Sequence, residues 1–129
     1  MSRARGLGLL AACMMFAVAA PAWAHHGVAG YVSSKSTTIE GTVTKFDFSN
    51  PHTILALDVK DANGKVVEWQ AEMTSPNHLM REGWTKTTLK PGDMVTISGY
   101  PSKSGANSVW IKSIAKSGGR PLPLTGDEN

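Results

Sequence analysis

Two runs of alternating apolar and polar residues, joined by a tight-turn signal, constrain the fold of this chain most strongly. Apolar residues at every second position place one face of a strand on a core and leave the other face to solvent. Asn63-Gly64 lies between the runs and is typical of a type I′ turn, which requires positive φ. The apolar members of the two runs are Leu55, Leu57 and Val59, then Val67, Trp69, Ala71 and Met73. The sequence therefore predicts a β-hairpin with one wet face.

A further strand with a change of parity precedes this hairpin. Ile39, Gly41 and Val43 alternate with polar residues, whereas Phe46 and Phe48 carry the apolar signal on the opposite parity. A bulge adds one residue to a strand and produces such a change, so we expect one near Thr44-Lys45.

A short helix is expected after the hairpin. Ser75 can supply an N-cap oxygen, and Pro76 suits the first helical position. Leu79 and Met80 can face the core, and Gly83 suits the positive φ at a helix end.

Two more strands complete the domain. They are marked by Val95 and Ile97, and then by Val109, Ile111 and Ile114. Three strands, a helix and two strands predict an all-β fold, a small five-stranded OB-like barrel with the helix between the third and fourth strands. An open sandwich of five or six strands with the helix as a lid is the alternative.

The first 24 residues have the features of a secretory signal peptide. A basic start is followed by an apolar run from Leu7 to Ala20, and Ala22 and Ala24 are the small residues that signal peptidase requires. Two other interpretations are a membrane anchor, for which the run is short, and lipoprotein processing at Cys13. We expect cleavage after Ala24, a periplasmic location and no transmembrane segment in the mature chain.

The expected organisation has four parts. They are the signal peptide (1–24), an N-terminal arm (25–37), the OB-like barrel (38–116) and a flexible tail (117–129).

Cleavage changes the composition. The 129-residue chain has 13 basic and 10 acidic residues, a net charge of +3, and one cysteine. Removal of the first 24 residues, which include Arg3, Arg5 and Cys13, leaves 105 residues with 11 basic side chains, a net charge of +1 and no thiol. A nearly neutral surface gives little steering toward nucleic acid. We therefore expect no nucleic acid, and as partner an unknown small ligand or a periplasmic protein.

Histidine positions suggest a metal site. After cleavage His25 becomes the first residue, and its α-amine and imidazole can chelate one ion. A third nitrogen from His26, His52 or His78 would complete a set that suits Cu(II). The other interpretation is a solvated arm whose histidines bind nothing.

A second set of candidates concerns a ligand groove. Asn50 and His52 lie in the predicted loop between the first two strands, which borders the ligand site in OB barrels. Glu72 lies on the wet face of the third strand, and Arg81 near the helix C-terminus can bind an anion. Alternatively, Asn50 only ends a strand, Glu72 is an ordinary solvated residue and Arg81 favourably meets the helix dipole.

No catalytic motif is visible, so we expect a binding protein and no enzyme. The first hypothesis is a non-enzymatic periplasmic binding or accessory module of unknown ligand. The alternative is a periplasmic copper-binding protein that uses His25.

An ordered set of short motifs resembles the small exported bacterial proteins of domain-of-unknown-function family 6152. The motifs are Ala24-His25-His26, Gly41-Thr42-Val43, Asn50-Pro51-His52, Glu72 with Ser75-Pro76, Leu79, Arg81 with Gly83-Trp84, and Leu89-Lys90-Pro91-Gly92-Asp93. The resemblance implies a periplasmic location and a compact β-rich fold, and it implies no activity. Similar members often have a bulky aromatic residue soon after the histidine pair. Gly27-Val28-Ala29-Gly30 follows here, so we expect an arm that is not packed tightly on the barrel.

Overall fold

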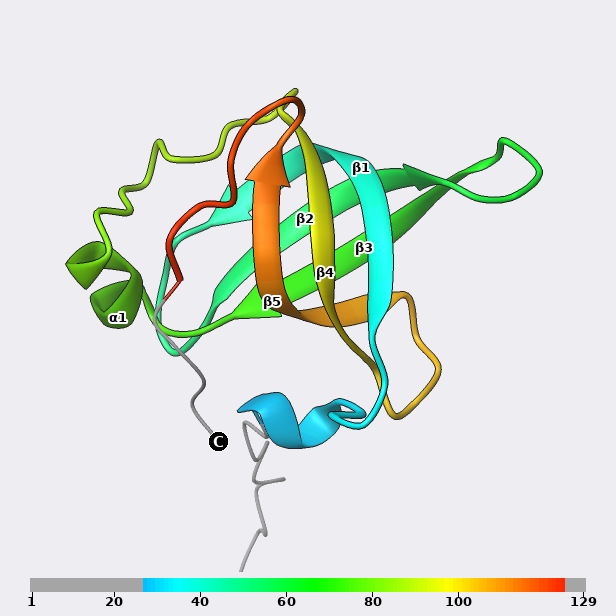
Figure 1. The fold of residues 1–129 in the computed structure, drawn as a ribbon, viewed down its shortest axis with the longest axis horizontal. Coiled ribbons are helices and arrows are strands. Elements are labelled where there is room, and N and C mark those ends of the chain that lie inside the picture. Colours follow the sequence, from blue (N-terminus) through cyan, green and yellow to red (C-terminus); the bar gives the residue numbers. More distant parts are fainter. Residues whose placement is uncertain (1–26, 125–129) are drawn as a thin grey trace, which may run out of the picture.

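Five strands close into a barrel in the order β1-β2-β3-β5-β4 (Figure 1). The structure is a computed structural model that describes residues 27–124. All neighbouring strands are antiparallel except β3 and β5, which are parallel. The elements are η1 (Gly27–Gly30), β1 (Thr37–Asp47), β2 (Thr53–Lys60), β3 (Val66–Met73), α1 (Pro76–Arg81), β4 (Met94–Pro101) and β5 (Ser108–Lys116). The predicted OB-like barrel is confirmed, and closure excludes the open sandwich.

The barrel interior is filled by the alternating apolar residues. Leu55, Leu57, Ala71, Ile97 and Ile114 are fully buried. Apolar burial of this kind contributes about 1.5–3 kcal/mol for each large side chain. The predicted wet face of β3 is also present, with Glu68 and Gln70 exposed.

Two register shifts and one close contact at a glycine accompany the closure of this small barrel. The β1–β2 register shifts between Val43 and Lys45, which confirms the predicted bulge. A second shift lies between Ser98 and Gly99 in β4. A Cβ atom on Gly99 would lie 1.9 Å from the carbonyl oxygen of Trp110, so only glycine fits at this position of the β4–β5 ladder.

The hairpin between β2 and β3 is present, but its turn differs from the predicted type. A type I′ turn requires positive φ at both of its central residues. Gly64 has a φ of 79°, but every described residue with positive φ is a glycine, so Asn63 does not have one. The amide of Gly64 donates to the carbonyl of Asp61, and the amide of Asp61 donates to the carbonyl of Lys65. Glycine at the last turn position therefore gives a longer loop of the kind that ends in a bulge.

Helix α1 begins at Pro76 as predicted, and Gly83 follows its end with a φ of 87°. Ser75 makes no side-chain cap. Leu79 is fully buried, but the expectation that Met80 also faces the core is wrong, because Met80 is 53% exposed. Trp84 is buried instead, and its indole N–H donates to the carbonyl of Pro123 at 2.6 Å.

The arm and the described part of the tail pack on the barrel more closely than the sequence indicated. Tyr31 is 8% exposed and forms a bridge with Ser102. The amide of Leu122 donates to the carbonyl of Ile114, and Leu122 and Leu124 lie against the core. Tyr31 supplies the aromatic anchor that Gly27–Gly30 lack. Across residues 27–124, none of the helices has the length and apolar character needed to span a membrane.

Candidate functional site

His52 and Glu72 form the centre of a polar group on the outside of the barrel. His52 follows the cis peptide bond between Asn50 and Pro51 in the loop before β2, and Glu72 is near the end of β3. The His52 Nδ1 atom lies 2.6 Å from Glu72 Oε1. A carboxylate only accepts, so Nδ1 donates and Nε2 of the neutral ring keeps its lone pair. The two side chains are 22% and 20% exposed, so a ligand can reach them.

Tyr31 holds the other oxygen of the same carboxylate. Its hydroxyl donates to Glu72 Oε2 at 2.7 Å and lies 3.0 Å from Ser108 Oγ, which then donates to it. Burial raises the pKa of Tyr31 to about 12, and the neighbouring Glu72 acts in the same direction. The phenol therefore stays protonated at neutral pH and fixes the carboxylate.

Trp110 forms the wall of this group. Its ring meets that of His52 edge-on, with centroids 5.4 Å apart and planes at 87°. The Tyr31 ring lies on it at 5.9 Å. We call His52, Glu72, Tyr31, Ser108 and Trp110 the His52 cluster. Packing and hydrogen bonds together hold the His52 imidazole in one orientation.

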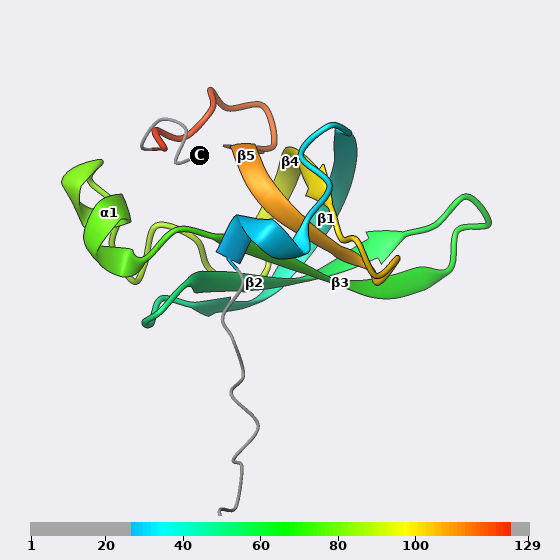
Figure 2. The ribbon, with the colours of Figure 1, turned by 90° about the horizontal axis from the view of Figure 1, so that it is seen from below.

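The first described residue of the arm lies directly on the His52 ring. A Cβ atom on Gly27 would lie 3.3 Å from His52 Cε1 and 3.8 Å from Nε2. Gly27 also has a φ of 46°, a conformation that other residues rarely adopt. Figures 1 and 2 show η1 at one side of the barrel, where the chain enters β1. The chain therefore approaches the barrel at His52.

The sequence matches the family of unknown function DUF6152 over residues 12–110. The chain belongs to this family. None of the curated proteins matches it significantly.

Several solved structures are similar to this chain at low sequence identity. A ZRD-deleted mutant of TiaS in complex with agmatine is 19% identical, with a TM-score of 0.48 over 75% of this chain. The chain spans only 24% of the length of that protein. The N-terminal domain of PriB from Thermoanaerobacter tencongensis is 20% identical, with a TM-score of 0.47, over 64% of this chain and 96% of that domain. The mitochondrial single-stranded DNA binding protein Rim1 from S. cerevisiae is 10% identical, with a TM-score of 0.48, over 64% of this chain and 93% of that chain. These likenesses concern the fold alone.

The structure brings together only some of the predicted site residues. His52 and Glu72 are in contact. Asn50 is exposed in the preceding loop. Arg81 is exposed at the end of α1. Figures 1 and 2 both show α1 apart from η1. The predicted ligands His25 and His26 lie outside the described residues.

His78, the fourth histidine, lies on α1, where its Nδ1 is 3.0 Å from Thr74 Oγ1. Between residues 27 and 124, His, Cys, Asp and Glu side chains form no group of three that could hold a metal ion. A metal site of such side chains at His52 therefore needs ligands from outside residues 27–124.

Sequence reasoning missed three members of the cluster, Tyr31, Ser108 and Trp110. Tyr31 had one available signal, because it is the first bulky aromatic residue after the histidine pair.

Proposed function

We propose that this protein is an exported, non-enzymatic binding module, and that its ligand at the His52 cluster is Cu(II). Cleavage after Ala24 would make His25 the first residue, with a free α-amine beside its imidazole. Those two nitrogens and His52 Nε2 would form the three-nitrogen set that Cu(II) favours. The observation that carries the proposal is the contact of Gly27 with the His52 ring.

The length of the chain supports this arrangement. Consecutive Cα atoms are about 3.8 Å apart, so the Cα atom of His25 is at most about 7.6 Å from that of Gly27. That limit would allow an amino-terminal imidazole to reach His52 Nε2. His78 lies on α1, where its Nδ1 is near Thr74 Oγ1, and it is not a member of the His52 cluster.

The surroundings of His52 support a ligand role. Histidines that bind metals usually donate their other ring N–H to a carboxylate, which fixes the tautomer and raises the basicity of the ligating nitrogen. Glu72 stands in that position, and Tyr31 holds Glu72 in turn. The imidazole is thus oriented before any ion arrives.

The ligand types favour copper over other metals. The mature chain has no cysteine, which removes the thiolates that structural zinc sites commonly use. An amine with two imidazoles suits the tetragonal preference of Cu(II).

The experiment uses protein exported with its own leader in a Gram-negative host. Intact mass should show a chain that begins at His25. Titration with Cu(II) against a competing chelator should then give one site. Electron paramagnetic resonance should show nitrogen ligands.

Two ligand variants and one control test the assignment. His25→Ala and His52→Ala should each weaken Cu(II) binding by more than the roughly 10–100-fold typical of losing an outer partner. His78→Ala changes a histidine outside the cluster and should bind like the wild type. A mature chain that begins elsewhere, or unchanged affinity in His25→Ala and His52→Ala, would refute the copper assignment.

A further inference from the structure

The first half of β3 has an open edge. On one side β3 pairs with β2 along its whole length, from Val66 to Met73. On the other side β5 pairs only with Gln70, Ala71 and Glu72. In the part of the chain that the structure describes, no strand covers this second side of β3 at positions 66 to 69. An uncovered edge presents backbone donors and acceptors to any added strand.

The direction of the backbone groups follows from the hydrogen bond at the start of the β5 ladder. The amide of Gln70 donates to the carbonyl of Asn107 at 3.0 Å, so Gln70 points its backbone toward the β5 side. Backbone groups alternate between the two sides of a strand. Glu68 and Val66 therefore point their N–H and C=O groups to the open edge, and Val66 is 54% exposed.

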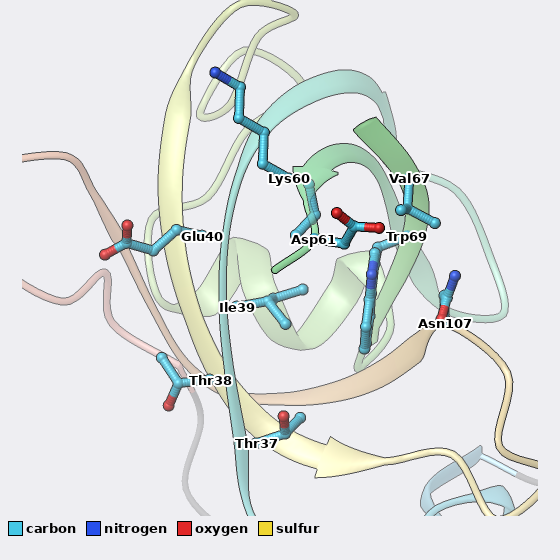
Figure 3. Close-up of a pocket in the computed structure, with 10 residues that line it drawn as sticks. Thr37, Thr38, Ile39, Glu40, Lys60, Asp61, Val67, Trp69 and Asn107 are labelled. Atoms are coloured by element: carbon cyan, nitrogen blue, oxygen red, sulfur yellow. The ribbon is translucent and has the colours of Figure 1, made fainter. Parts of the chain in front are cut away.

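A groove of about 600 Å³ runs beside this edge. Figure 3 shows Ile39 of β1 pointing toward Trp69 of β3, with Val67 above the tryptophan ring and Asn107 beside it. Val67 and Trp69 lie on the side of β3 that faces the barrel interior, so the groove is the open mouth of the barrel. A strand added at the edge would direct every second side chain into it.

Charges on the outer face of this edge restrict the partner further. Glu68 is exposed on the face of β3 opposite to the groove, and its neighbour across the β2–β3 ladder is the exposed Asp58, while Lys60 is the neighbour of Val66. Acidic side chains on this face favour basic side chains on the same face of an added strand, since unlike charges across a strand pair are stabilising.

From these observations we infer that the groove binds an extended peptide in which apolar and basic residues alternate. The peptide adds as a strand to the open edge of β3 and hydrogen-bonds the backbone of Val66 and Glu68. Its apolar side chains enter the groove beside Trp69 and Ile39, and its basic side chains lie on the outer face with Glu68. This site goes beyond the proposed copper function and does not depend on it, because it lies on the other half of β3 from Glu72.

The test uses the mature exported protein and a fluorescein-labelled six-residue peptide of alternating valine and lysine. Fluorescence anisotropy should show saturable binding, with Kd raised at least about tenfold for the matched valine–glutamate peptide. Two further peptides carry N-methyl groups on alternate amides, one on the odd positions and one on the even. A strand uses only one of these sets toward its neighbour, so one peptide should lose about tenfold in affinity and the other should bind normally. Equal binding of both would show charge attraction alone and overturn the proposal.

A pair of variants at one position separates backbone from charge. Glu68→Pro removes the edge N–H together with the charge, whereas Glu68→Ala removes the charge only. We expect about a tenfold loss in the first and no more than about threefold in the second. Equal losses would contradict strand addition.

A measurement on the unaltered chain covers the case in which Glu68→Pro does not fold. In an amide NMR titration, Val66 and Glu68 should show the largest shift changes and gain exchange protection. Changes confined to other residues would refute the site, and so would dimerisation through this edge that the peptide does not reverse in sedimentation.

Discussion

Replacement of Tyr31 by phenylalanine tests whether the arm is fixed to the barrel as described. The change removes one oxygen atom and leaves the ring, which packs on Trp110 at 5.9 Å. No cavity forms in the ring's place. The loss is therefore that of the hydroxyl contacts with Glu72 at 2.7 Å and Ser108 at 3.0 Å.

The expected effect can be worked out from those two bonds. A hydrogen bond to a charged group contributes about 1.5–3 kcal/mol, whereas one between neutral groups contributes about 1 kcal/mol. Glu72 keeps its bond to His52, and its partial exposure lets water replace part of what is lost. We expect Tyr31→Phe to lower the free energy of unfolding by about 2 kcal/mol. At about 4 °C per kcal/mol for a domain of this size, the midpoint should fall by about 8 °C.

The assay is thermal and urea denaturation of the protein, monitored by circular dichroism. Tyr100→Phe is the matched control, because Tyr100 is the other of the two tyrosines and its ring contacts Lys112 through its face. That variant should change the unfolding free energy by less than about 0.5 kcal/mol. If Tyr31→Phe is as stable as the wild type, or if Tyr100→Phe loses as much, the bond between arm and barrel is not what stabilises the arm.

Three further predictions concern the same cluster and the barrel closure. The pKa of Tyr31 is about 12 in the folded chain against 10 when unfolded, so its stabilising effect is full below pH 10 and is lost as the pH rises toward 12. Urea titrations should show this loss in the wild type relative to Tyr31→Phe, and equal pH dependence would contradict it. Glu72→Gln should weaken Cu(II) binding about 10–100-fold while the protein stays folded, as measured by chelator competition, and wild-type affinity would exclude Glu72 as the partner that orients His52. Gly99→Ala should prevent cooperative folding in circular dichroism melts, because its Cβ would lie 1.9 Å from the Trp110 carbonyl oxygen, whereas Gly30→Ala, with open space around it and no positive φ, should still fold.

Local signals in the sequence predicted most of the strands. Alternation over Leu55 to Val59 and Val67 to Met73 fixed the hairpin faces, since a half-buried strand needs that period. The parity change after Val43 located the bulge, because an inserted residue shifts every later side chain to the other face.

Contacts between distant segments could not be predicted in this way. Tyr31 and Glu72 are 41 residues apart, and nothing in either segment specifies the other. Trp84 and Pro123 are 39 residues apart, and their contact gives Trp84 the buried position that the helix pattern assigned to Met80. The fold class and His52 with Glu72 were therefore accessible to sequence reasoning, whereas the rest of the cluster was not.

The His52 cluster depends on the parallel ladder between β3 and β5, because its residues come together only when these two strands are paired. This ladder has three residue pairs, fewer than any other in the barrel, and it joins the two ends of a sheet that is otherwise antiparallel. Glu72 and Trp110 form one of its pairs, and Ser108 forms another with Gln70. The His52 cluster is thus assembled when β3 pairs with β5 and the barrel closes. Local separation of β3 from β5 would disrupt the cluster while the other ladders persist. A ligand held between His52 and the arm would then stabilise the closed barrel. Slower amide exchange in the β3–β5 ladder would report its binding.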